Sequence, residues 1–306
     1  MKNFNLILTI LVFSFHILIA ASSDPVFGEN GMIVSTSKQA SEAGIEILKK
    51  GGNAVDAAVA VGFALAVTSS SNGNIGGGGF MVAAMTDGET FTLDYREKAP
   101  AAAHRDLFLN DSGNVVPGMS LFSRAGSGVP GTVDGLIRAL ADHGSGNITL
   151  RQALAPAIRL AEKGFELSHY EARRFNGYEG LFQSNDAAAA IFIRKDNNPW
   201  KKGDKLVQRD LAKTLKRISK YGRDGFYTGP VADLIVAEMK RGNGLISLED
   251  LKNYSSVYRD PVSGTYNGHE VISMGPPSSG GALLVNMMNM LENYPVDSLG
   301  WNSSDY

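Results

Sequence analysis

The sequence has 306 residues, of which 43% are hydrophobic and 20% charged, so it can bury the core of one large domain or of two modest ones. The net charge is −2, and Lys and Arg are spread along the chain, which excludes nucleic acid as a partner. The absence of Cys excludes disulfides and thiolate chemistry, and the few His residues do not have the spacing of a zinc site.

Residues 1–23 have the layout of a secretory signal peptide. Lys2 precedes an apolar run that ends at Ala20, and small residues follow it before Asp24. We therefore expect cleavage between Ala20 and Asp24 and a secreted or periplasmic protein. The alternative is that residues 4–20 stay as an anchor, which would hold the protein on the outward face of a membrane. That run contains polar residues and is short for a span of ~20 residues.

The first predicted elements are a strand, two helices and a hairpin. Residues 31–37 form a short apolar run with β-branched residues, which predicts a strand. Residues 38–52 have apolar positions at helical spacing and end in two glycines. Asn53 is placed to cap a helix over residues 54–70, which is apolar on nearly every side and should be buried. Residues 80–97 alternate around an Asp-Gly turn and predict a β-hairpin.

Four consecutive glycines, Gly76, Gly77, Gly78 and Gly79, stand between the second helix and the hairpin. A glycine loop that binds phosphate follows a strand and precedes a helix, and its P-loop form ends in Lys and Ser or Thr. This run follows a helix, precedes a strand and contains no Lys. The order favours a packing role, in which the backbone passes where no side chain fits. A pocket for an anion, lined by the glycine amides, stays open as a second role.

Helix signals dominate the middle of the chain. Four segments each end in glycine, and several carry Lys or Arg in the last turn, as helices commonly do. They are residues 131–144, 148–164, 203–222 and 230–242.

The last third of the sequence combines turn and cap signals. Ser247 and Asp250 have the spacing of a capping box for a short helix. Asn267-Gly268 predicts a type I′ hairpin, and Ser278 or Ser279 is placed to cap a final apolar helix. That helix is rich in Leu and Met, and little sequence follows it. We therefore expect the chain to be shorter than the domain to which it belongs.

Several stretches, taken in order, resemble the γ-glutamyltransferase (glutathione hydrolase) family. The match runs from about Gly28 to about Gly300 and implies an α+β fold of the N-terminal nucleophile hydrolase type. In that fold α/β/β/α layers are stacked, and residues 24–306 would hold an incomplete, large-subunit portion of them. The matching stretches are GMIVSTSKQASEAGIEILKKGGNAVDAAVAVGFALAV, NIGGGGFM, DYREKAP, GSGVPGTVDG, ITLRQALAPAIRLAEKGF, GFYTGPVADLIV, LISLEDLKNYSSVYRDPVSGTYNGHEV and PPSSGGALL.

The resemblance also implies the chemistry. An exported precursor cuts itself into a large and a small subunit, and the Thr exposed at the start of the small subunit attacks the γ-glutamyl amide of glutathione or a related compound. The α-amino group of that Thr serves as its base, and no cofactor takes part. Water or an amino-acid acceptor then releases the γ-glutamyl group. An acylase or a capsule-polyglutamate enzyme on the same scaffold stays open as a variant of this function.

Within DYREKAP, Arg96 matches the family's arginine that holds the α-carboxylate of the glutamyl group, and Glu97 matches the acidic residue beside it. A planar guanidinium suits this task because it binds a carboxylate with two parallel hydrogen bonds. The resemblance places the four glycines near the site as supports. The nucleophile would lie beyond Tyr306, so the chain holds no catalytic residue of its own.

We therefore expect the chain alone to be inactive and to need the small subunit of the same precursor. The alternative is an exported, truncated paralogue that binds or regulates without catalysis.

Overall fold

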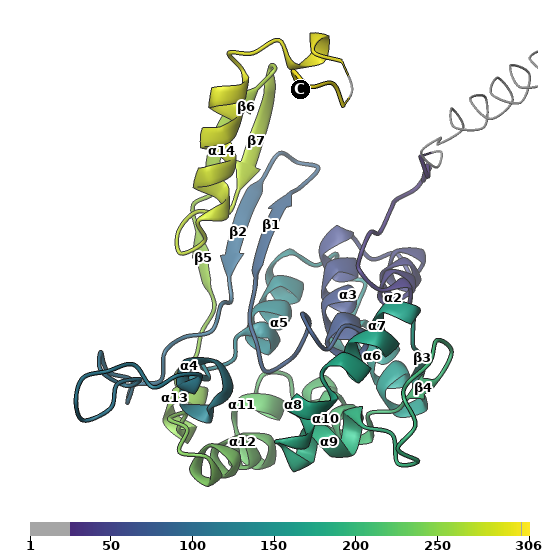
Figure 1. The fold of residues 1–306 in the computed structure, drawn as a ribbon. Coiled ribbons are helices and arrows are strands. Elements are labelled where there is room, and N and C mark those ends of the chain that lie inside the picture. The colour runs from purple at the N-terminus through teal and green to yellow at the C-terminus, as the bar shows by residue number, and fades with distance from the viewer. Residues whose placement is uncertain (1–24, 301) are drawn as a thin grey trace, which may run out of the picture. The chain divides into compact units, whose positions relative to one another are not determined.

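The computed structural model describes residues 25–300 and 302–306, so the predicted signal peptide lies outside the described residues. Contacts divide the chain into two units, Met1–Met32 and Ile33–Tyr306. The described part of the first unit, residues 25–32, forms neither helix nor strand. The second unit contains every helix and strand labelled in Figure 1. Among the described residues, no helix has the length and hydrophobicity needed to cross a membrane.

Two helices open the second unit, and both were predicted. Helix α2 (Lys38–Lys49) begins at Ser37, whose side chain accepts a hydrogen bond from the amide of Ala40. Helix α3 (Ala54–Thr68) begins at Asn53, and Asn53 and Asp56 form a reciprocal capping box there. Most residues of α3 are buried, as expected for a helix that is apolar on nearly every side.

The strand predicted at residues 31–37 is not present, and that prediction is wrong. Burial still alternates within residues 33–37, because Val34 is exposed whereas Ile33 and Ser35 are half-buried. A strand also requires a neighbour that completes its ladder of hydrogen bonds, and no described strand pairs with this segment. An apolar run with β-branched residues could not show whether a partner strand lies beside it.

A three-stranded antiparallel sheet contains the strand that precedes Arg96 and Glu97 in the chain. Its order is β1 (Phe80–Ala84), β2 (Thr90–Asp94) and β5 (Val257–Arg259). The predicted hairpin is confirmed, with Gly88 at φ +90° in its turn. Phe91 and Leu93 of β2 are buried in the same hydrophobic cluster as residues of α3 and of α5 (Thr132–His143). Helix α5 packs directly against β2 (Figure 1).

The middle of the chain is helical, and the four segments predicted there are confirmed. They are α5, α6 (Leu150–Lys163), α10 (Arg209–Tyr221) and α12 (Gly229–Arg241). Helix α6 packs on α3 and α10 packs on α6, so the core extends from the sheet through successive helices. Several short elements before or between these helices were not individually predicted: α4 (Met119–Phe122), η1 (Arg124–Gly126), β3 (Phe165–Glu166), α7 (His169–Gly177), α8 (Glu179–Gln183), α9 (Asp186–Phe192), β4 (Lys205–Leu206) and α11 (Asp224–Tyr227).

The last third contains the short helix α13 (Leu248–Asn253), with the predicted capping box, and the hairpin of β6 (Val262–Tyr266) and β7 (His269–Ser273). Asn267 and Gly268 both have positive φ, as a type I′ turn requires. Helix α14 (Gly280–Leu291) follows and packs on this hairpin, and η2 (Val296–Ser298) ends the described elements. Ser279 occupies the cap position of α14, whereas the side chain of Ser278 accepts the hydrogen bond from Gly280.

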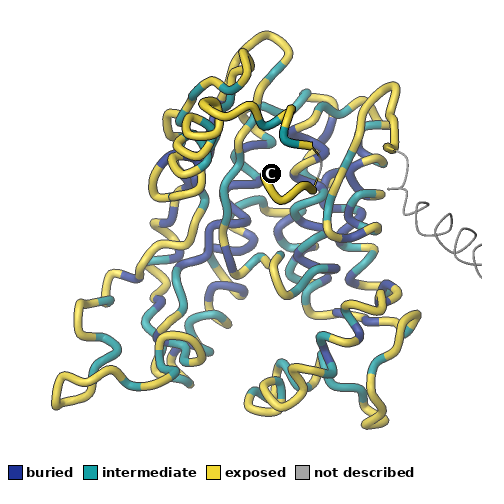
Figure 2. The backbone as a smooth tube through the Cα atoms, turned by 45° about the horizontal axis from the view of Figure 1, so that its top comes forward, coloured by how far each residue is buried: buried dark blue, intermediate teal, exposed yellow. Residues whose placement is uncertain are grey.

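Helix α14 is poorly covered, as its sequence predicted. Only Gly281 is buried, and about half of the surface of Leu283, Met287 and Met290 is exposed, at 55%, 49% and 53%. Figure 2 shows this contrast with the buried helices elsewhere in the unit. The helix packs on β6 and β7, while much of the surface of these three apolar side chains stays exposed.

Replacing Asn53 with Ala is expected to lower the free energy of unfolding by about 1–2 kcal/mol. The side chain of Asn53 caps α3 by accepting from the amide of Asp56 at 3.0 Å, and it also donates to the carbonyl of His143 at 2.8 Å. The matched control is Asn185→Ala, because Asn185 caps only the short, exposed helix α9. Urea denaturation of both variants would test this, and an equal loss in the two would contradict it.

Candidate functional site

Arg96 and Glu97 directly follow β2, close to where β1 begins. Both residues are exposed, and neither side chain forms a hydrogen bond or ion pair with the part of the chain that the structure describes. An exposed guanidinium without a partner retains all its donors for an external anion. Arg96 is therefore chemically available to bind a carboxylate.

The peptide backbone of Arg96 is held in place, although its side chain is free. The amide of Arg96 donates to Oδ1 of Asp94 at 3.0 Å, and the hydroxyl of Tyr254 donates to the carbonyl oxygen of Arg96 at 2.8 Å. The second oxygen of Asp94 accepts a hydrogen bond from Nε of Arg259 at 2.7 Å. Each oxygen of this carboxylate thus accepts a hydrogen bond, and neither bond comes from the Arg96 guanidinium.

The glycine run passes against the same peptide. A Cβ atom on Gly78 would lie 2.6 Å from the carbonyl oxygen of Tyr95 and 2.8 Å from Cα of Arg96. Gly79 exchanges two hydrogen bonds with Tyr95, which continue the β1–β2 ladder by one more pair. The carbonyl of Gly77 accepts from the amide of Gly131, just before α5. The run therefore brings the strand, the helix and the Arg96 peptide together where a side chain would not fit.

Tyr254, which follows α13, was not identified from the sequence. It is only 3% exposed, and its ring is stacked parallel to the ring of Tyr227 with 5.8 Å between the centroids. Burial, together with the nearby carboxylates of Asp134, Asp94 and Glu97, raises the pKa of Tyr254 above its ordinary value. The phenol therefore stays protonated at neutral pH and can donate to Arg96.

The ion pair between Asp134 and Arg223 stabilises the segment around Tyr254. Oδ1 of Asp134 accepts from Nε of Arg223 at 2.7 Å, and Oδ2 accepts from the amide of Ser256 at 2.7 Å. Arg223 also donates to the carbonyls of Lys252 and Tyr254. Asp134 and the amide of Ser256 are buried, so this network fixes the chain on both sides of Tyr254.

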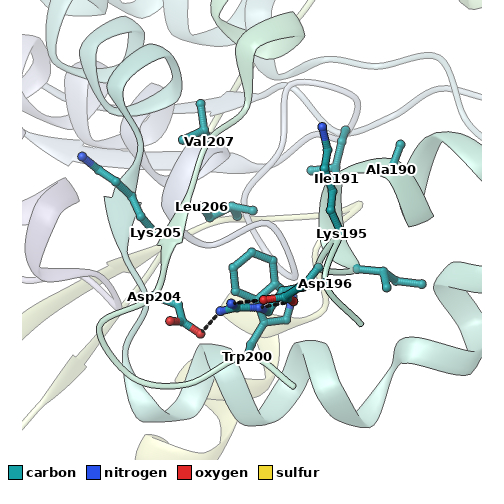
Figure 3. Close-up of a pocket in the computed structure, with 11 residues that line it drawn as sticks. Ala190, Ile191, Lys195, Asp196, Trp200, Asp204, Lys205, Leu206 and Val207 are labelled. Carbon is teal, nitrogen blue, oxygen red and sulfur yellow. Dashed lines mark hydrogen bonds and ion pairs between the residues drawn. The ribbon is translucent and has the colours of Figure 1, made fainter. Parts of the chain in front are cut away.

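A cavity of about 510 Å³ lies elsewhere, between α9 and β4 (Figure 3). Arg194 lines it, pairs with Asp196 at 2.6 Å and with Asp204 at 2.5 Å, and lies over the ring of Trp200. The hydrogen bond from Arg194 lowers the pKa of Asp196. Arg194 thus pairs with two carboxylates of its own segment, and the pair with Asp204 ties together the two ends of residues 194–204. Arg96, in contrast, lacks such partners, and we therefore take Arg96 as the candidate binding residue.

Comparisons with known proteins match this chain to glutathione hydrolase proenzymes and also, at 34–36% identity, to acylase proenzymes of Pseudomonas sp.. The sequence model of gamma-glutamyltranspeptidase matches residues 40–306. A glutathione hydrolase proenzyme of Pseudomonas sp. (strain A14) is 46% identical over 298 residues, which cover 97% of this chain and 51% of that protein. The glutathione hydrolase proenzyme of Escherichia coli (strain K12) is 46% identical over 281 residues, which cover 92% of this chain and 48% of that protein.

A solved structure is similar over most of the chain as well. The crystal structure of Helicobacter pylori gamma-glutamyltranspeptidase matches with a TM-score of 0.88 at 43% identity, and the match covers 92% of this chain and 80% of that chain. The chain spans about half the length of the curated relatives it matches.

Proposed function

Because the chain belongs to the gamma-glutamyltranspeptidase family, we propose that it forms the donor-binding part of an exported enzyme. Its fold is the α+β fold of the N-terminal nucleophile hydrolases that the sequence resemblance implied. The proposed reaction is the transfer or hydrolysis of the γ-glutamyl group of glutathione and related γ-glutamyl amides. Residues 1–23 direct export in this proposal.

One observation carries the proposal for this chain: the Arg96 guanidinium is exposed and unpaired among the described residues, on a peptide held from both sides. The α-carboxylate of a γ-glutamyl donor is a small planar anion, and a guanidinium binds such an anion with two parallel hydrogen bonds. In this proposal Arg96 binds that carboxylate and so orients the γ-carbonyl. Glu97 lies beside it, and the glycine run supports it.

The covalent step uses a nucleophile from outside this chain. We propose that a threonine at the start of the small subunit of the same precursor attacks the γ-carbonyl and that its own α-amino group takes the hydroxyl proton. The amide C–N bond then breaks, the leaving amine receives that proton, and water or an amino-acid acceptor releases the γ-glutamyl group. The chain alone is then inactive, because the group that forms the γ-glutamyl enzyme is missing from it.

The test joins residues 25–306 in frame to the part of the Escherichia coli relative that follows its matched segment. We expect this full-length chimera to hydrolyse γ-glutamyl-p-nitroanilide and residues 25–306 alone to be inactive. Arg96→Ala in the chimera should raise KM about 100-fold, because a charge-assisted pair with the substrate is lost. The matched control is Arg105→Ala, since Arg105 is exposed and pairs only with its neighbour Asp106.

Two results would overturn the proposal. An Arg96→Ala chimera with an unchanged KM would remove Arg96 from the donor site. A chimera that cuts itself and hydrolyses other amides, but not γ-glutamyl amides, would assign the scaffold to an acylase activity instead.

A further inference from the structure

We propose that Asp94 and Tyr254 are positioning residues that aim the Arg96 guanidinium and thereby set the preference for donors with an α-carboxylate. This inference rests on the proposed function. Its basis is that the two peptide groups next to the Arg96 side chain are each bonded to a buried side chain: the amide to Asp94 at 3.0 Å and the carbonyl to Tyr254 at 2.8 Å.

Asp94 ends strand β2 and turns the chain. Its Oδ1 accepts from the amide two residues later, which is the geometry of an Asx turn and fixes the direction in which residue 96 leaves the strand. Arg259 of the neighbouring strand β5 occupies Oδ2. Asp94 therefore shapes the backbone of Arg96 without neutralising the guanidinium, which stays available for a ligand.

Tyr254 fixes the other side of the same residue. Its ring stacks on that of Tyr227 and also contacts the ammonium group of Lys98, which lies 5.2 Å from the ring centre. Arg223 holds its backbone carbonyl. With ring and backbone both fixed, the single hydroxyl proton of Tyr254 has a defined position, and it is donated to Arg96.

This support matters because an arginine side chain rotates about several bonds, and two parallel hydrogen bonds to a carboxylate tolerate little error in direction. A misplacement of about 1 Å can cost on the order of 100-fold in rate. Tyr254→Phe keeps the stacked ring and removes only the hydroxyl. We therefore expect an intermediate effect of about tenfold, confined to donors that carry the α-carboxylate.

The experiment measures kcat/KM of the full-length chimera on two substrates that differ only in the α-carboxylate: γ-glutamyl-p-nitroanilide and 4-aminobutanoyl-p-nitroanilide. Tyr254→Phe should lower the ratio of the two values about tenfold, through the KM of the glutamyl substrate. A purely structural defect would lower both values alike and leave the ratio unchanged. The matched control is Tyr227→Phe, which keeps the other ring of the stacked pair and removes a buried hydroxyl that donates to the carbonyl of Pro130 at 2.8 Å and accepts from the amide of Asp134 at 3.3 Å. It should leave the ratio unchanged.

Arg96→Ala separates the two proposals. If it leaves the ratio unchanged, the proposed function fails. If it lowers the ratio and Tyr254→Phe does not, only the positioning role of Tyr254 fails.

A second measurement does not depend on activity. In the full chain, hydrogen–deuterium exchange of the segment around Arg96 should be faster in Tyr254→Phe than in Tyr227→Phe. Equal exchange in the two variants would show that the Tyr254 hydroxyl does not hold the Arg96 peptide, and it would overturn the inference. This result can be obtained even if the Tyr254→Phe chimera does not mature.

Discussion

Gly78→Ala will lower the free energy of unfolding by at least about 3 kcal/mol, the upper part of the range for overpacked sites. The new methyl group would lie 2.6 Å from the carbonyl oxygen of Tyr95, 2.7 Å from the amide nitrogen of Glu97 and 2.8 Å from Cα of Arg96. All three are backbone atoms, so no side chain can rotate away, and the backbone of residues 95–97 must shift. Chemical denaturation of the purified variant is the measurement.

The same glycine run provides the control. Gly76→Ala places its Cβ 3.5 Å from the side chain of Asn74, which is ordinary contact, and it should change stability little. We expect Gly78→Ala to reduce folding and maturation more than substrate affinity. A Gly78→Ala protein that folds normally and loses only affinity would contradict this and would assign the glycine to ligand binding.

The second large effect is expected at Asp134. Asp134→Ala should cost about 3–5 kcal/mol, because removing one partner of a buried ion pair leaves the other unpaired. Here the change leaves Arg223 without its carboxylate and the buried amide of Ser256 without an acceptor. The side chain of Arg223 is 31% exposed and can gain some hydration, so the lower end of that range is expected.

Asp210→Ala is the matched control for this charge. Asp210 and Lys213 form an ion pair of 2.8 Å with side chains that are 86% and 76% exposed, and such pairs contribute about 0–1 kcal/mol. Urea denaturation of both variants gives the comparison. Equal losses at the two positions would mean that the Asp134 network adds no more than a surface pair.

The sequence predicted those elements whose signals lie within the element itself. Asn53 indicates where helix α3 begins, and Asn267-Gly268 indicates the turn of the β6–β7 hairpin. Caps, glycine stops and turn dipeptides act through neighbouring backbone groups, so they can be recognised locally. This is why the long helices and both hairpins were correctly predicted.

The errors and omissions lie where structure depends on distant parts of the chain. Residues 31–37 have strand-like alternation but no described partner strand. The two-residue strands β3 and β4 form a ladder only because Phe165 meets Leu206 across the fold. Such short segments carry no periodic signal of their own, so sequence patterns could not identify them.

The candidate site divides in the same way. Arg96 and Glu97 were found only through the DYREKAP stretch, since an Arg-Glu pair after a strand is ordinary surface sequence. Tyr254 and Arg259 were missed because their roles depend on contacts with residues far away in the chain. A partial signal existed: the capping box of α13 fixes where that helix begins, and Tyr254 follows directly after its end.

The contact between Tyr254 and Arg96 joins positions 158 residues apart, and it has a consequence for biosynthesis. Ribosomes add about 5–20 residues per second, so roughly 8–30 s separate the synthesis of the two residues. During that interval the β1–β2 hairpin can form. The edge of β2 that later pairs with β5 is still unpaired and can form hydrogen bonds with another segment or another chain. Slower translation would lengthen the time for which the edge of β2 stays unpaired before β5 is synthesised.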